Sequence, residues 1–309
     1  MDCAMLFPGQ ASQYVGMGRD YYDACDVVRE TYDAANKILG FDITGLSFEG
    51  NLEELTKTHN AQPAILIHSV AVYRALAKKQ FAPKIVAGHS LGEFSALVAA
   101  GFFDYDDALL IVRKRGELMY EAGLEVPGTM AAIIGLAEED VRACVSDASK
   151  EGIIVVANFN SPEQFAVSGE VKAVERAIEL AKGLGAKRAL RLQVSGAFHS
   201  PLMGKTSDSL VSYIKKFGHG RLGTSWVANV TGEAVENENE VVGLLSRQLS
   251  SPVQWVKSMR TLAERYRGPV FEVGPGKVLT GLMKRIVPDV AVHSLTEIAS
   301  MEQALDMRR

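Results

Sequence analysis

The sequence of 309 residues has few cysteines, no excess of positive charge and no long apolar run. Its cysteines, Cys3, Cys25 and Cys144, are far apart and form no C-x-x-C pair, which predicts reduced thiols rather than a disulfide framework. The formal net charge of -4 argues against non-specific binding of nucleic acid, which normally needs a basic surface. Apolar runs such as 131–134 and 152–157 are far shorter than the ~20 residues of a membrane-spanning helix. The sequence therefore predicts neither a membrane partner nor a nucleic-acid partner.

Several motifs that would indicate a cofactor are also missing. There is no G-x-G-x-x-G, and no set of histidines or cysteines at the spacing of a metal site. The stretch EVGPGKVLTGL (272–282) is not a Walker A loop, because Phe271 stands where the first glycine belongs and Val278 replaces the serine or threonine. The first residues, MDCAMLFPGQ, lack the basic start and the apolar segment of a secretory signal. The sequence thus predicts a cytoplasmic protein with no tightly bound cofactor and no metal.

What the sequence does contain is an alternation of short apolar runs and helical patterns. Hydrophobic residues make up 47% and charged residues 23%, which is an ordinary globular composition for one large domain or two unequal ones. The runs AMLFPGQ, PKIVAGHS, SWVANV, PVFEVG and VAVHSL are predicted as strands. Helices are predicted at 20–39, 59–80, 91–100 and 104–123. This alternation predicts an α/β fold with a mostly parallel sheet and helices on both of its faces.

The middle of the sequence follows a different order. Between residues 126 and 197, strand-like and helix-like stretches succeed one another as β-α-β-β-α-β, the order of a ferredoxin-like unit. The preceding junction, EVPGT, combines proline and glycine as turns do. We therefore predict a small domain, 126–197, inserted into a large domain formed by 1–125 and 198–309. A cleft between two domains is a usual place for a ligand.

One stretch, IVAGHSLGEFSALVAAG (85–101), carries a serine in a motif of chemical interest. Ser90 lies in G-x-S-x-G between a predicted strand and a predicted helix, which is the context of a nucleophile elbow. Glycines on both sides relieve Cβ clashes at the sharp turn, and the helix that follows points its N-terminal N–H groups at the site. The alternative is an ordinary tight turn with an incidental serine, but the strand and helix around the motif favour the nucleophile.

A serine nucleophile needs a base within hydrogen-bond reach. The sequence has six histidines: His59, His68, His89, His199, His219 and His293. Most of them suit a local or structural role, including His89, because adjacent residues at an elbow point in different directions. Two remain as candidates: His293 near the C-terminus, and His199 in a loop after the last strand of the predicted small domain. The pattern favours His199, since loops at domain junctions often carry function.

Residues 104–123 place an arginine on the apolar face of a predicted helix. Ala108, Val112, Arg115 and Met119 share that face, whereas Arg113 does not. A buried guanidinium needs a carboxylate or a phosphate, because an unpaired buried charge is costly. The partner could be an internal Asp or Glu, or it could be the carboxylate of a substrate. The periodicity of the helix does not distinguish these alternatives.

Taken together, these residues closely resemble the malonyl-CoA:acyl-carrier-protein transacylases of bacterial fatty-acid synthesis. The resemblance runs almost from end to end of the chain. The matching stretches are FPGQASQ-x-VGMG (7–18), QPA (62–64), AGHSLGE (87–93), RG-x-LM (115–119), NFNSP (158–162), GAFHSPLM (196–203), RQL (247–249), PVQW (252–255) and EVGPGKVLTGL (272–282). The resemblance implies a hydrolase-like, mostly parallel α/β core with an inserted ferredoxin-like domain.

The resemblance also implies catalytic roles. Ser90 would be the nucleophile and His199 its base, and the main-chain carbonyl of Gln248 would orient the histidine in place of a triad aspartate. The main-chain N–H groups of Gln10 and Leu91 would form the oxyanion hole. Losing one such donor typically lowers the rate by about 10²–10³-fold.

For the substrate, the resemblance implies malonyl-CoA, with no tightly bound cofactor. Arg115 would hold the free carboxylate of the malonyl group, and Gln62 and Asn160 would be further pocket residues. In the wider acyltransferase family, Leu91 and Phe198 stand at positions that accompany malonyl. Phe198 would crowd an α-methyl branch, although shape alone typically discriminates by only ~1–3 kcal/mol.

The implied reaction is ping-pong transfer of malonyl to the phosphopantetheine thiol of an acyl carrier protein. The alternatives are an acyltransferase that serves a polyketide synthase and a thioesterase or other hydrolase that uses the same elbow. Carrier proteins of such systems are acidic, so a basic docking patch is expected despite the negative net charge. The candidate docking residues are Lys187, Arg188, Arg191, Lys205 and Lys215.

Overall fold

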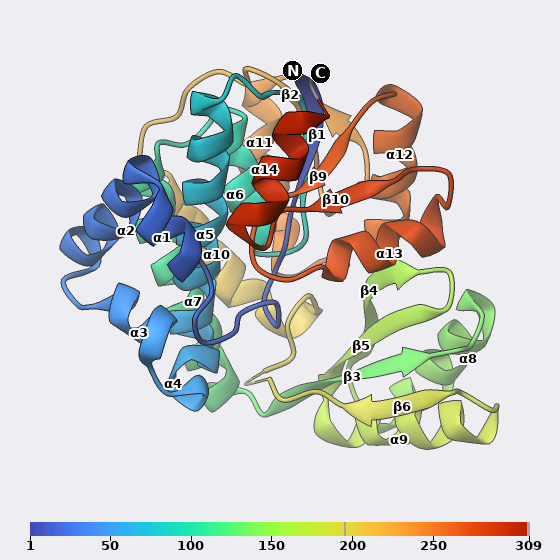
Figure 1. The fold of residues 1–309 in the computed structure, drawn as a ribbon. Helices are drawn as coiled ribbons and strands as arrows, with labels where there is room; N and C mark the ends of the chain where they lie inside the picture. The colour runs from blue at the N-terminus through green and yellow to red at the C-terminus, as the bar shows by residue number, and fades with distance from the viewer. Residues whose placement is uncertain (195, 308–309) are drawn as a thin grey trace.

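The computed structural model describes residues 1–194 and 196–307 (Figure 1). Residue 195 of the predicted small domain and residues 308 and 309 of the predicted large domain lie outside this range. The described residues form a mainly parallel sheet, sheet A, and a separate antiparallel sheet, sheet B. The predicted fold class is therefore confirmed.

Sheet A combines strands from both ends of the sequence. Its strand order is β10-β9-β1-β2-β7-β8, and every neighbouring pair is parallel except β7 with β8. The strands are β1 (Asp2–Phe7), β2 (Ala82–Gly88), β7 (Ser225–Val227), β8 (Ala234–Val235), β9 (Val270–Glu272) and β10 (Val292–Ser294). The register pairs Phe7 at the end of β1 with Gly88 at the end of β2. The loop after β1 therefore begins beside the turn that carries Ser90.

Helices cover both faces of sheet A, as Figure 1 shows. They are α1 (Arg19–Ala24), α2 (Asp26–Leu39), α3 (Ile43–Glu49), α4 (Leu52–Thr56), α5 (Thr58–Lys78), α6 (Gly92–Ala99), α7 (Tyr105–Glu125), the 3₁₀ turn η2 (Pro201–Met203), α10 (Gly204–Ile214), α11 (Glu238–Gln248), α12 (Trp255–Arg265), α13 (Val278–Ile286) and α14 (Ile298–Asp306). Alternate residues of β1 point to opposite faces. Met5 and Phe7 join the core under α5, α6 and α7, whereas Ala4 and Leu6 join the core under α12 and α13.

The N-terminal helices differ from the prediction. The single helix predicted at 20–39 is divided at Cys25, which has an extended backbone conformation (φ -129°, ψ 117°) and separates α1 from α2. The break lets α2 turn its buried face toward α5, a tertiary contact that periodicity does not reveal. The short helices α3 and α4 were not predicted either. Each starts at a polar cap, since Asp42 and Asn51 accept hydrogen bonds from main-chain N–H groups of the first turn.

Sheet B has the order of a ferredoxin-like unit. Its strands, in the order β4-β5-β3-β6, are all antiparallel to their neighbours. The elements are β3 (Gly128–Ile134), α8 (Glu138–Ala148), the 3₁₀ turn η1 (Ser149–Glu151), β4 (Ile154–Ser161), β5 (Gln164–Glu170), α9 (Val171–Gly183) and β6 (Arg188–Arg191). Helices α8 and α9 pack on one face and enclose a separate apolar core (Figure 1).

A short parallel bridge joins sheet B to the segment before α12. Val253, in the segment before α12, pairs with Asn158 on β4. The Val253 N–H donates to the Ala157 carbonyl at 2.9 Å, and the Phe159 N–H donates to the Val253 carbonyl at 3.0 Å. A second contact lies at the end of β2, where His89 Nε2 is 2.8 Å from Asn160 Oδ1 on β4. None of the helices among residues 1–194 and 196–307 has the length and apolar character needed to cross a membrane.

Candidate active site

Ser90 sits on a strained turn between β2 and α6. Its φ of 51° lies in the left-handed region that non-glycine residues rarely adopt. The flanking glycines are needed for steric reasons: a Cβ on Gly88 would overlap the main chain at Gly92, and a Cβ on Gly92 would overlap the Phe7 carbonyl. The strand, sharp turn and helix agree with the elbow predicted from G-x-S-x-G.

The loop after β1 packs against this turn. A Cβ on Gly9 would lie 2.5 Å from the His89 carbonyl oxygen, so only glycine allows the two segments to approach this closely. The next residue, Gln10, therefore lies close to the turn that bears Ser90 and Leu91. Within the described residues, the main-chain N–H groups of Gln10 and Leu91 have no hydrogen-bond acceptor. Both are thus available to an external oxyanion, and their role stays a prediction.

His199 is the histidine in hydrogen-bond contact with Ser90. The Ser90 Oγ lies 2.8 Å from His199 Nε2, and His199 Nδ1 lies 2.9 Å from the Gln248 carbonyl oxygen. Because a carbonyl can only accept, Nδ1 carries the proton and Nε2 is free to accept the Ser90 hydroxyl proton. Gln248 is the last residue of α11, whose terminal carbonyls have no partner within the helix. The negative end of that helix also favours the imidazolium that forms during catalysis.

The other histidines lie elsewhere. His89 Nε2 is 2.8 Å from Asn160 Oδ1 on β4, and the ring of buried His68 meets Tyr21 edge to face. His59 contacts Tyr120, and His219 stacks on Phe102. His293, the other sequence candidate, is exposed on β10 with its ring near Phe271. The geometry therefore selects His199.

Burial makes His199 an uncharged base over a wide pH range. Removal from water, followed by the nearby Arg115 cation, lowers the pKa of His199 to about 3. The neutral form is therefore present throughout the range in which a free histidine gains a proton. We expect the single-turnover rate of Ser90 acylation to be flat from pH 5 to 7. Rapid-quench measurement across that range tests this, and an inflection near the ordinary histidine pKa of about 6.5 would contradict it.

Arg115 projects from α7 to the base of the site and is fully buried. Its Nη1 donates to Gln62 Oε1 at 2.6 Å, and its Nη2 donates to Ser90 Oγ at 3.1 Å and to Gln248 Oε1 at 3.0 Å. No carboxylate among the described residues forms an ion pair with it, which removes the simplest structural alternative. Burial lowers the pKa of Arg115 to about 9, so it is still a cation at neutral pH. A cation beside a nucleophile suits an acyl group with an anionic end.

A cavity of about 430 Å³ opens above Ser90 and His199. Its walls are largely apolar and include Phe198, which is itself buried, and Asn160 lies at its rim on β4. Further apolar lining residues are Met119, Met130, Ala166, Leu192, Leu279 and Leu282. The predicted pocket residues Asn160 and Phe198 therefore line the cavity, whereas Gln62 lies behind it and contacts Arg115. In the part of the chain that the structure describes, no cluster of His, Cys, Asp or Glu could hold a metal ion.

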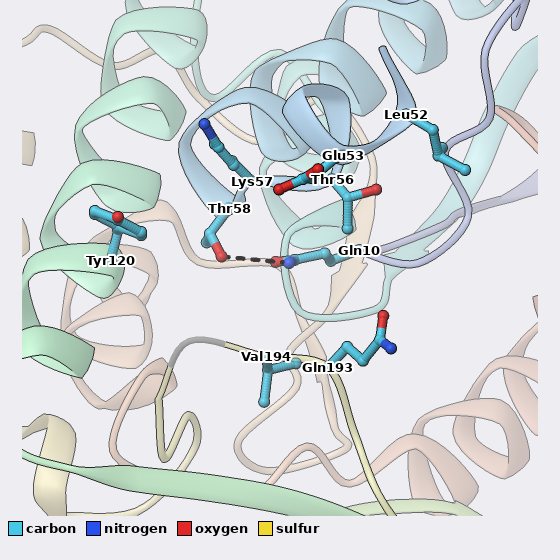
Figure 2. Close-up of a pocket in the computed structure, with 9 residues that line it drawn as sticks. All are labelled: Gln10, Leu52, Glu53, Thr56, Lys57, Thr58, Tyr120, Gln193 and Val194. Atoms are coloured by element: carbon cyan, nitrogen blue, oxygen red, sulfur yellow. Dashed lines mark hydrogen bonds between the residues drawn. The ribbon is translucent and has the colours of Figure 1, made fainter.

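A second cavity adjoins the first at Gln10. It is lined by Gln10, Leu52, Glu53, Thr56, Lys57, Thr58, Tyr120, Gln193 and Val194. Figure 2 shows the Gln10 side chain turned toward Thr58, whose Oγ1 accepts from Gln10 Nε2 at 3.4 Å. Gln10, Thr56, Gln193 and Val194 line both cavities. The main chain of Gln10 thus lies beside the elbow, and its side chain lies between the two cavities.

Sequence reasoning missed two residues that support the site. Asn229, which follows β7, accepts from the Ser90 N–H at 2.7 Å and donates to the Gly88 carbonyl at 2.6 Å. Glu93, in the first turn of α6, is buried and receives hydrogen bonds from the Asn229 main chain and the Gln248 side chain. A charge inside the apolar stretch LGEFSALVAA was a signal for Glu93, because acidic residues are rarely buried. No motif marked Asn229.

The candidate docking residues fall into two groups. Lys187, Arg188 and Arg191 belong to the edge of sheet B at β6, where Lys187 pairs with Glu163 and Arg191 donates to Thr129. Lys205 and Lys215 lie at opposite ends of α10, in the layer of sheet A. Figure 1 shows β6 and α10 in different parts of the molecule, so the structure does not unite all five residues in one patch.

Comparison with known proteins identifies the family. The family model described as acyl transferase domain matches residues 4–306. The malonyl CoA-acyl carrier protein transacylase of Escherichia coli (strain K12) is 43% identical over 305 residues, 98% of this chain and 99% of that protein. That of Bacillus subtilis (strain 168) is 40% identical over 303 residues, 98% and 96% respectively. The chain belongs to the malonyl-CoA:acyl-carrier-protein transacylase family. It is therefore an acyltransferase.

Solved structures of this transacylase family share the fold. The transacylase from Streptococcus pneumoniae aligns with a TM-score of 0.92 at 38% identity, covering 99% of this chain and 100% of that one. A malonyl-transacylase solved in complex with its type II polyketide synthase acyl-carrier protein aligns with a TM-score of 0.95 at 41% identity, with the same coverage. The family resemblance inferred from the sequence is thus confirmed.

Proposed function

We propose that this acyltransferase moves a malonyl group from malonyl-CoA to the phosphopantetheine thiol of an acyl carrier protein, through an ester on Ser90. The observation that carries the proposal is Arg115, a buried cation that contacts the Ser90 Oγ and has amides rather than a carboxylate as its other partners. A malonyl group on Ser90 would supply the missing carboxylate. The names of the curated relatives support the same substrate.

In the first half-reaction, Ser90 Oγ attacks the thioester carbonyl carbon while His199 Nε2 accepts the hydroxyl proton. The main-chain N–H groups of Gln10 and Leu91 receive the oxyanion that forms. The carbon–sulfur bond then breaks, and the proton on Nε2 passes to the CoA sulfur. CoA leaves, and malonyl remains as an ester on Ser90 with its carboxylate at Arg115.

The second half-reaction reverses the roles. The thiol of the carrier arm gives its proton to His199 Nε2 and attacks the ester carbonyl. The carbon–oxygen bond to Ser90 breaks, and Oγ takes the proton back from Nε2. Gln248 keeps the imidazole in the same tautomer throughout, because its carbonyl holds the proton on Nδ1. No aspartate is needed in this scheme, since the carbonyl end of α11 faces the imidazolium.

Two other functions compete with fatty-acid synthesis. A polyketide role draws support from the solved relative that is bound to a type II polyketide synthase acyl-carrier protein. Hydrolysis through the same elbow is disfavoured by Arg115, which a simple esterase does not need.

The three cysteines of the described chain are free, which supports the predicted cytoplasmic setting. The separate core of sheet B supports the proposed division into 1–125 with 198–309 and 126–197.

A transfer assay tests the proposed function. Malonyl-CoA, methylmalonyl-CoA and acetyl-CoA are each supplied with one holo carrier protein, and acyl-carrier product and free acid are quantified by mass spectrometry. We expect rapid malonyl transfer, slower transfer of the other two groups, and little free malonate. Loss of malonyl-CoA at the same rate without carrier protein would instead identify a hydrolase. Parallel assays with fatty-acid and polyketide carriers separate the two pathways.

Docking of the carrier is expected to depend on salt. Lys187, directly before β6, and Arg188 and Arg191 on β6 form a basic group, and an acidic carrier that docks there would bind more weakly as salt screens the charges. We expect the apparent KM for the carrier to rise roughly several-fold between 50 and 300 mM salt, because salt screens the attraction between exposed charges. The KM for malonyl-CoA in the first half-reaction serves as the internal control. Arg188→Glu should raise the carrier KM, and a carrier KM indifferent to both changes refutes docking at β6.

A further inference from the structure

Glu93 holds an unusual position for a carboxylate. It lies in the first turn of α6 with an exposed fraction of only 1%. Its Oε1 accepts from the Asn229 main-chain N–H at 2.7 Å, and its Oε2 accepts from Gln248 Nε2 at 2.6 Å. We infer that Glu93 is a positioning residue that orients the Gln248 side-chain amide and thereby holds Arg115 ready for the substrate carboxylate. This inference rests on the proposed function, in which Arg115 binds malonate.

The neighbours of the Gln248 side-chain amide set its orientation. An amide has a donor end and an acceptor end, and its neighbours decide which way it points. Around Gln248, Glu93 Oε2 and the Ser90 carbonyl both accept from Nε2, at 2.6 and 2.8 Å. The opposite end, Oε1, is thereby directed at Arg115 Nη2, 3.0 Å away. If the amide turned over, its NH₂ group would face the guanidinium, and two donors would repel.

Glu93 also adds a carboxylate to the electrostatics around Arg115. Both Glu93 oxygens receive N–H donors, an arrangement that matches an ionised carboxylate. Burial raises the pKa of Glu93 to about 8, and the two donors and the Arg115 cation limit that rise. In its ionised form, Glu93 offsets part of the cost of burying Arg115 and raises the pKa of that guanidinium. The Gln248 amide separates the two charges, so the face of Arg115 toward Ser90 stays open for an incoming carboxylate. A direct ion pair would have occupied the guanidinium.

Glu93 is also linked to the nucleophile through Asn229. Asn229, which donates to Glu93 through its main chain, holds both sides of the elbow through its side chain, at Gly88 and at Ser90. Glu93 therefore contacts the supports of the elbow and of Arg115 at once. A change at this position is expected to affect the fit of the acyl carboxylate more than the attack on the thioester, because His199 is held by the Gln248 main chain and not by its side chain.

A second buried carboxylate provides a matched control. Glu272, at the end of β9, is fully buried and accepts from the main-chain N–H groups of Leu279 and Thr280. It caps α13 and has no contact with Arg115 or Gln248 among the described residues. If Glu93 were merely a buried helix cap, Glu93→Gln and Glu272→Gln would behave alike: each would lower stability, and neither would change the choice of acyl group.

The experiment is a double-mutant cycle on substrate preference. The ratio of kcat/KM for malonyl-CoA to that for acetyl-CoA is measured for the wild type, E93Q, R115A, the E93Q/R115A double variant and E272Q. We expect E93Q to lower the ratio by about 10-fold, the range typical of a lost hydrogen bond to a charged group. In the R115A background, E93Q should lower the ratio no further, because Glu93 acts through Arg115. The E272Q ratio should equal that of the wild type.

The outcomes separate this inference from the proposed function. An unchanged ratio in R115A overturns the carboxylate role of Arg115, and the role of Glu93 falls with it. A strong R115A effect combined with an unchanged E93Q ratio, or with an E93Q effect that persists without Arg115, overturns the Glu93 inference alone. If E93Q does not fold, Q248M breaks the same link while keeping the main-chain carbonyl that holds His199. The ratio should then fall as predicted for E93Q, and an unchanged Q248M ratio also overturns the inference.

Discussion

Ser90→Ala protein mixed with radiolabelled malonyl-CoA is expected to retain no label after denaturation and gel filtration. Wild-type protein should carry one malonyl group as an ester that is stable to denaturation and labile to base. The cause is the loss of the Oγ that His199 and Arg115 contact, at 2.8 and 3.1 Å. Transfer to a carrier protein should fall by about 10⁵–10⁶-fold, comparable with the loss of a nucleophile in other serine enzymes.

Ser95→Ala is the matched control for this experiment. Ser95 lies in α6, the helix that follows the Ser90 turn, and it is buried; its Oγ has no hydrogen-bond partner within the described residues. Removing that hydroxyl should leave ester formation and transfer close to wild type. Stable base-labile label on the Ser90→Ala protein would place the nucleophile elsewhere and would falsify the proposed mechanism.

Arg115→Ala is expected to lower malonyl transfer by about 10²–10³-fold and to improve acetyl transfer relative to malonyl. The variant leaves the malonyl carboxylate in a buried pocket without its cation, whereas an acetyl group has no carboxylate to place there. In the wild type the preference is opposite, because an acetyl group leaves the buried guanidinium without an anionic partner. The measurement is kcat/KM for malonyl-CoA and acetyl-CoA with the same carrier protein.

Arg113→Ala separates this effect from a general loss of helix α7. Arg113 lies two residues earlier, pairs with Glu117 and donates to the His59 carbonyl, away from Ser90. Its loss should reduce stability without altering the preference between acyl groups. If Arg115→Ala and Arg113→Ala changed the preference equally, the carboxylate role of Arg115 would have to be abandoned.

The sequence was most informative where a single element determines the geometry. The glycines around Ser90 and the apolar periodicity of residues 104–123 were enough to predict a sharp turn and a buried arginine, since both depend on local backbone rules. The β-α-β-β-α-β order likewise predicted sheet B. In contrast, patterning alone left His199 and His293 as alternatives, because the residues themselves do not say which of them folds back onto β2.

What the sequence could not provide were contacts between distant segments. Glu93 and Gln248 are 155 residues apart in the sequence. Asn229 follows β7, the strand that pairs with β2, and contacts the elbow from there. Neither helix propensity nor residue spacing predicts such tertiary contacts, because they depend on how α11 and β7 pack around α6. The same holds for the break at Cys25, where the demands of packing override a continuous helical pattern.

The bridge between Val253 and β4 has a consequence for the order of events at the cleft. Rotating sheet B away from sheet A would break the two main-chain hydrogen bonds of Val253 and the contact of His89 with Asn160. We therefore expect the cavity above Ser90 and His199 to keep its width during turnover, without a hinge motion of sheet B. Donor and acceptor must then use one fixed entrance in turn, and the departure of CoA becomes the step that clears the way for the carrier arm.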